Sequence, residues 1–133
     1  MSYDLMVFDP EAAPASRDAF MAWYHKQTQW KEEHGYNDPS VTAPKLRLWF
    51  DEMIQTFPPM NGPFRSADVD NPKVTDYSVG RSVIYAAFAW SEAKTARPAM
   101  RRLAQKHGVG FFDVSTDNGE ILMPTKKPWW KLW

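Results

Sequence analysis

Blocks of apolar residues separated by polar turns predict four strands along the chain. The longest near-continuous apolar run is residues 81–90, Arg-Ser-Val-Ile-Tyr-Ala-Ala-Phe-Ala-Trp, and its β-branched and aromatic residues favour a strand. A shorter run at residues 3–8 predicts a second strand. Residues 110–115 and 120–124 predict two more, because Asp117-Asn118-Gly119 between them is a typical hairpin turn.

Apolar residues at helical spacing predict three helices, over residues 16–34, 42–57 and 91–107. Their expected N-caps are Ser16, Thr42 and Ser91. The helix over 42–57 has the clearest stripe, formed by Leu46, Trp49, Phe50, Met53, Ile54 and Phe57. Pro98 predicts a kink or a late start in the third helix, because proline removes a backbone hydrogen bond and clashes one turn back.

Residues 58–79 are polar and rich in proline and aspartate, which predicts a long loop that is either functional or disordered. The element order β-α-α-β-α-β-β indicates an α+β fold: a two-layer sandwich with a mainly antiparallel four-stranded sheet backed by helices, loosely ferredoxin-like. We expect one domain over residues 1–124 and a C-terminal tail, 125–133, with three tryptophans and three lysines in its last eight residues.

The run at residues 81–90 is apolar at both parities, which is unusual for a two-layer sandwich. In such a fold one sheet face meets the helices and the other faces water, so strands should alternate apolar and polar residues. The second face therefore needs a cover. The candidates are the 58–79 loop, the tryptophan-rich tail, or a partner protein, including a second copy in a homodimer.

Charge and composition exclude several classes of function. Sixteen Lys and Arg balance sixteen Asp and Glu, so the chain lacks the field that general nucleic-acid binding requires. The absence of cysteine removes disulfides, thiolate metal sites and cysteine nucleophiles. His25, His34 and His107 are not spaced as metal ligands. No catalytic or cofactor motif is recognisable, and the lack of a signal peptide or membrane span predicts a cytoplasmic protein.

The 58–79 loop supplies the main candidate for a recognition surface. Its aspartates, Asp68, Asp70 and Asp76, form either a solvated acidic loop or a surface that meets basic residues of a partner. Tyr77 and Arg81 are residue types that often anchor interfaces. The outer members of this predicted partner-binding set are Tyr36, Asp38 and Asn61.

Three stretches together resemble a known group of proteins: residues 3–10 (Tyr-Asp-Leu-Met-Val-Phe-Asp-Pro), 58–63 (Pro-Pro-Met-Asn-Gly-Pro) and 108–115 (Gly-Val-Gly-Phe-Phe-Asp-Val-Ser). The chain resembles a family of small, largely uncharacterised bacterial cytosolic proteins. These are similar to the single-domain immunity partners of secreted bacterial toxins. The resemblance implies a non-enzymatic protein that neutralises a toxin by occluding its active site.

An alternative function stays open beside the immunity-type protein. The chain is also compatible with a small-molecule-binding domain, or a small enzyme, whose pocket lies between the sheet and the 58–79 loop. The polar groups of that pocket would be Tyr24, His25, Asp76 and Tyr85.

Overall fold

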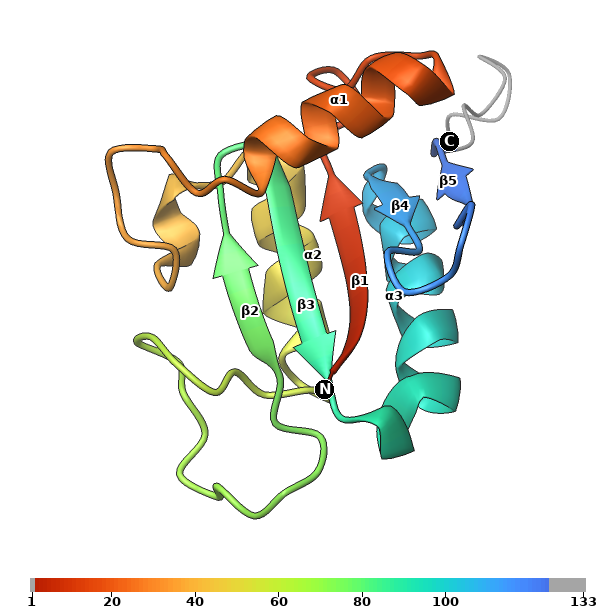
Figure 1. Ribbon diagram of the computed structural model, residues 1–133. Coiled ribbons are helices and arrows are strands. Elements are labelled where there is room, and N and C mark those ends of the chain that lie inside the picture. The colour runs from red at the N-terminus through yellow and green to blue at the C-terminus, as the bar shows by residue number, and fades with distance from the viewer. Residues whose placement is uncertain (1, 125–133) are drawn as a thin grey trace, which may run out of the picture.

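The computed structural model describes residues 2–124, which form an α+β fold around one antiparallel sheet (Figure 1). Its five strands are β1 (Tyr3–Phe8), β2 (Asp76–Val79), β3 (Val83–Phe88), β4 (Gly110–Phe112) and β5 (Ile121–Leu122). Its helices are α1 (Arg17–Gln27), α2 (Pro44–Met53) and α3 (Ala93–His107), with 3₁₀ turns η1 (Pro39–Val41) and η2 (Trp90–Glu92). The sheet order is β2-β3-β1-β4-β5. The predicted α+β class is confirmed, with five strands where the sequence predicted four.

Strand β1 lies in the middle of the sheet, between β3 and β4. It pairs along its whole length with β3, from Tyr3 opposite Phe88 to Phe8 opposite Val83. Its second half also pairs with β4, with Met6 opposite Phe112. Because both faces of β1 are covered and five of its six residues are buried, its apolar residues occur at both parities.

One face of the sheet packs against α2 and α3. This main core contains Leu5, Ile84 and Phe88 from the sheet and Trp49 and Met100 from the helices, all 0–1% exposed. The apolar stripe of residues 42–57 thus faces the sheet, as its spacing predicts. Ion pairs between Glu52 and Lys106 and between Glu52 and His107 join the two helices at the surface.

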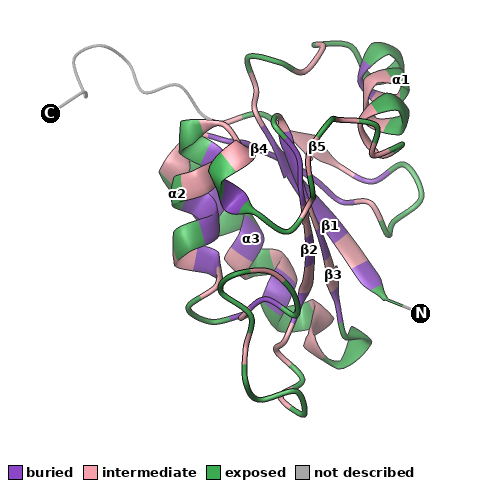
Figure 2. Cartoon of the chain, turned by 90° about the vertical axis from the view of Figure 1, so that its left-hand side faces the viewer, coloured by how far each residue is buried: buried purple, intermediate pink, exposed green. Residues whose placement is uncertain are grey.

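The opposite face of the sheet is covered in part by α1, which is a correction to the sequence analysis. Phe20, 1% exposed, projects from α1 onto Met6, Phe8 and Phe112. Figure 2 shows α1 on the side of the sheet away from α2 and α3, so the fold has three layers here instead of two. Where this face is buried, the cover is α1 and not the 58–79 loop, and the tail lies outside the described residues. A homodimer through the part of this face that α1 leaves uncovered stays a prediction.

The helix boundaries differ from the predicted ones in informative ways. Ser16 caps α1 as predicted, accepting a hydrogen bond from the Ala19 amide. However, α1 ends at Gln27 and not at residue 34: the Thr28 amide makes the last i→i−4 bond, to the Tyr24 carbonyl, and Trp30 then adopts a left-handed conformation. Trp30 therefore belongs to the following segment and not to the helix.

The other two predicted N-caps are wrong. Ala43, not Thr42, precedes α2, and the Thr42 hydroxyl bonds instead to the carbonyl of Arg81. Ser91 lies inside η2, and Glu92 precedes α3. Pro98 lies within α3, and the helix continues through it to Gly108, which adopts a left-handed conformation with φ of 69°.

The predicted 58–79 loop contains strand β2 at its C-terminal end. Asp76, Tyr77, Ser78 and Val79 alternate between half-buried and buried positions and pair with β3, which is the pattern of an edge strand. The preceding segment is anchored at its base, where the Thr75 amide bonds to the Pro58 carbonyl at 2.9 Å and the Met60 amide to the Thr75 carbonyl at 2.8 Å. Within residues 2–124, no helix is long and apolar enough to cross a membrane.

Candidate functional site

The α1-facing side of the sheet is open over strands β2 and β3, where it forms a polar groove. Its cavity has a volume of about 310 Å³. The floor comes from β2 and β3, and the rim comes from α1 and the segment that follows it. The lining residues are Tyr24, Thr28, Trp30, Asp76, Ser78, Tyr85 and Ala87.

The floor of the groove follows from strand pairing. Asp4 of β1 and Asp76 of β2 both lie directly opposite Ala87 of β3, one on each side. All three residues share a face of the sheet, because side chains opposite one another in a ladder point the same way. The two aspartates thus lie about 10 Å apart at their Cα atoms, with a methyl group between them. This small residue leaves the space open.

Tyr85 connects the groove to Asp4. Its hydroxyl donates a hydrogen bond to Asp4 Oδ2 at 2.5 Å. Burial, and then the bond to the Asp4 carboxylate, raise the pKa of Tyr85 well above its ordinary value. Burial also raises the pKa of Tyr24, against a smaller opposing effect of Tyr85. Both groups are therefore neutral phenols at neutral pH, and because the Tyr85 proton is donated to Asp4, the Tyr85 hydroxyl offers a ligand an acceptor.

Trp30 forms the rim with a backbone conformation that is unusual for its residue type. Its φ of 54° lies in the left-handed region, which costs a bulky residue about 1–3 kcal/mol. The ring explains why the conformation persists, because it packs edge-on against Tyr85 at 6.3 Å and Tyr36 at 5.0 Å between centroids. Strain of this kind is concentrated at functional sites.

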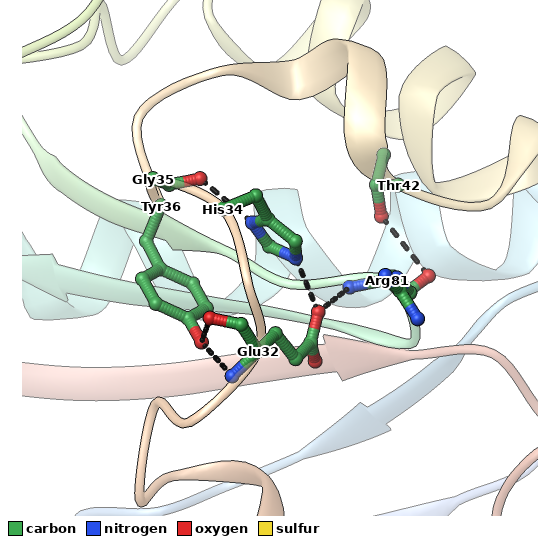
Figure 3. Close-up of polar contacts among 6 residues, drawn as sticks. All are labelled: Glu32, His34, Gly35, Tyr36, Thr42 and Arg81. Carbon is green, nitrogen blue, oxygen red and sulfur yellow. Dashed lines mark hydrogen bonds and ion pairs between the residues drawn. The ribbon is translucent and has the colours of Figure 1, made fainter.

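The segment carrying Trp30 is fastened to the β2–β3 turn through Glu32 (Figure 3). Glu32 Oε1 accepts hydrogen bonds from the Arg81 amide at 3.1 Å and from His34 Nε2 at 2.5 Å. The Tyr36 hydroxyl accepts a bond from the Glu32 amide, and the Tyr36 carbonyl accepts one from the Val79 amide. Side chain and backbone together fix the rim of the groove relative to the sheet.

His34 is held between two acceptors. Its Nδ1 lies 2.8 Å from the Gly35 carbonyl and its Nε2 faces Glu32. The bond to Gly35, and then the carboxylate of Glu32, raise the pKa of His34. The imidazolium satisfies both acceptors at once, whereas a neutral ring satisfies only one.

The predicted partner-binding residues do not form a single surface. Asp68 and Asp70 are exposed on the segment below the sheet, and Asn61 reaches from there to Asp76 with a long bond of 3.5 Å. Tyr36 and Arg81 lie at the opposite end of β2, where the Val79 amide donates to the Tyr36 carbonyl, and Asp38 caps η1 by accepting the Ser40 amide. Tyr77 is 4% exposed and donates to the Phe57 carbonyl, so it belongs to the core and not to an exposed interface.

The alternative set, by contrast, is largely brought together. Tyr24, Asp76 and Tyr85 line the same groove, although α1 and the segment after it form its rim, and residues 58–79 contribute to it through strand β2. His25 is exposed and outside the lining. The sequence analysis missed Asp4, Thr28, Trp30, Ser78 and Ala87. The alternation of Asp76 and Ser78 with buried neighbours was the available signal, because it marks a strand with a polar face.

A second polar cluster has a structural explanation. Arg97 of α3 bonds to Asp113 at 3.1 Å and to Glu120 at 2.5 Å, which ties the helix to the β4–β5 hairpin. Thr116 donates to the same Asp113 oxygen. No group of three or more potential ligands that could hold a metal ion occurs within residues 2–124.

Comparison with known proteins adds no assignment to this geometry. No family model, curated protein or solved structure matches the chain. The case for a function therefore rests on the groove itself.

Proposed function

We propose that the protein is a ligand-binding domain and that the groove under α1 is its recognition site. The observation that carries the proposal is the convergence of Tyr24, Asp76 and Tyr85, from three separate elements, on one cavity of about 310 Å³. Ligand sites typically combine such a concavity with aromatic walls and a few polar groups that fix orientation. The volume lies at the small end of their range, which favours a compact ligand or a single head group.

The chemistry of the groove favours binding over proton transfer by its tyrosines. A general base works best when its pKa is near the operating pH. The pKa values of Tyr24 and Tyr85 are instead raised, mainly by burial. As neutral phenols, they are suited to hold a polar ligand by hydrogen bonding.

The proposal is tested by filling the groove from its floor. In Ala87→Leu, the added carbons occupy the space between the two aspartates, so we expect ligands to be excluded. The assay is a fragment screen followed by amide chemical shifts, with Thr28, Ser78 and Ala87 as reporters in the native protein. Ala67→Leu, the same change at an exposed position, is the matched control.

The screen has a clear negative outcome. If no fragment shifts the groove amides, or if Ala87→Leu binds as the native protein does, the groove is not the recognition site. An unchanged amide spectrum elsewhere in Ala87→Leu separates a blocked site from a misfolded protein.

A second candidate function is binding of a partner protein through residues 60–74, as the resemblance to immunity-type proteins implies. The observation in its favour is that Asp68 and Asp70 flank Val69, which is 82% exposed, on a segment anchored by hydrogen bonds at its base. Where a toxin gene is found beside the gene of this protein, Asp68→Lys with Asp70→Lys should abolish co-purification with the toxin, while Asp117→Lys should not. Retained capture would count against this surface.

A further inference from the structure

We infer that the groove takes an organic cation, an ammonium or guanidinium head group, with the carboxylate of Asp76 as its counter-ion. This inference rests on the proposed ligand-binding function and specifies the class of ligand. It follows from three properties of the groove: its charge, its aromatic walls and its fixed rim.

The charge of the groove is negative and uncompensated. Asp76 is the one charged residue in the lining. Among the described residues, its hydrogen-bond partner is Asn61 at 3.5 Å, and it forms no ion pair with any lysine, arginine or histidine. Asp4, on the other side of Ala87, adds a second carboxylate to the same face. A half-buried carboxylate without a cation is the complement of a positively charged ligand.

The walls of the groove are aromatic. Trp30 stands nearly perpendicular to Tyr85, at 87°, and Tyr24 lies on the α1 side. The negative π-faces of tryptophan and tyrosine attract cations that approach within about 6 Å of the ring centroid. A carboxylate combined with several rings is the usual arrangement for recognising alkylammonium groups, since the rings also contact the carbon atoms around the charge.

The fixed rim adds specificity to this arrangement. Trp30 is held by ring contacts with Tyr36 and Tyr85, and its segment is fastened through Glu32 to the β2–β3 turn. A rim that is already in place before the ligand arrives loses less entropy on binding. We therefore expect the site to select for the size of the head group as well as for its charge.

The experiment compares choline with its neutral isostere, in which a carbon atom replaces the charged nitrogen. Binding is followed by the amide shifts of Thr28, Ser78 and Ala87, and the quaternary nitrogen keeps the charge of choline independent of pH. We expect choline to bind at these amides, and the neutral isostere to bind roughly tenfold more weakly or worse, since hydrogen bonds and ion pairs with charged groups exceed neutral contacts.

Asp76→Asn removes the charge while keeping the shape of the side chain. We expect it to weaken choline binding by roughly tenfold and to leave binding of the neutral isostere nearly unchanged. Asp70→Asn, the same substitution on the exposed segment, should change the binding of neither choline nor the neutral isostere.

A second pair of probes distinguishes two sources of such a cation, a small molecule and a basic side chain of a partner protein. These probes are ethylguanidinium and a lysine residue blocked at both ends. Stronger binding of the blocked lysine points to a basic side chain of a partner protein, and stronger binding of the free cations points to a small molecule.

The two proposals fail in different ways. If the neutral isostere binds at the groove as tightly as choline, or if Asp76→Asn binds choline as the native protein does, the cation inference is overturned while the groove remains a ligand site. If neither these probes nor the fragment screen shifts the groove amides, both proposals are overturned.

Discussion

Phe20 of α1 is the residue whose loss should best reveal how the third layer is held. It is 1% exposed and its ring contacts Phe8, Trp23 and Phe112 at centroid distances of 4.9, 5.6 and 5.2 Å. Truncation of a buried phenylalanine to alanine typically costs about 3–5 kcal/mol, from lost burial and from the cavity that remains. That is a large share of the roughly 5–15 kcal/mol by which a domain of this size is stable.

The measurement is urea unfolding of Phe20→Ala, followed by circular dichroism, with the free energy of unfolding extrapolated to zero denaturant. Phe64→Ala is the matched control, because the same atoms are removed from a side chain that is 47% exposed and contacts the Arg47 guanidinium at 5.7 Å. We expect the control to lose about 1 kcal/mol or less. The reasoning is refuted if the two variants are destabilised equally, since α1 would then not be packed on the sheet as described.

Two further predictions concern the rim and the sheet. Because the pKa of His34 is raised in the folded state, its contribution to stability is complete below its unfolded pKa of about 6.5 and is lost as pH rises through the folded value. The native protein should therefore lose more stability between about pH 6 and pH 9 than His34→Gln does, and parallel pH profiles in denaturant unfolding would contradict this. Gly110→Ala should destabilise β4 by about 1–3 kcal/mol, because a Cβ there would lie 2.2 Å from the Phe8 ring, and unchanged thermal unfolding would show that the ring can move aside.

The parts of the fold that could be predicted are those in which a long local pattern agrees with the packing. The stripe from Leu46 to Met53 produced α2 because it faces the sheet along its whole length. The hairpin at Asn118, with φ of 51°, follows from local turn chemistry. Strand β2 was missed because four residues with only Tyr77 and Val79 apolar carry little signal inside a proline-rich stretch.

The groove was only partly predictable, because it depends on which elements lie side by side. Asp4 and Asp76 are distant in sequence, and they come together only because β1 and β2 both flank β3. Trp30 falls within the helix predicted over residues 16–34, but α1 ends at Gln27, and the Trp30 ring packs against Tyr85 of the sheet. The cover supplied by α1 likewise requires knowledge of the face on which a helix packs, which spacing alone does not give.

The central position of β1 has a consequence for how the molecule folds. Its neighbours β3 and β4 come from the far half of the chain, so the middle of the sheet cannot form from local contacts. Folding rates fall as contacting residues lie farther apart in sequence, because loop closure precedes the stabilising contacts. During synthesis β1 leaves the ribosome before β3 and β4, and it finds both partners only after β4 has emerged. Until then its apolar side chains have no sheet to join, and this interval is when the chain is most exposed to aggregation.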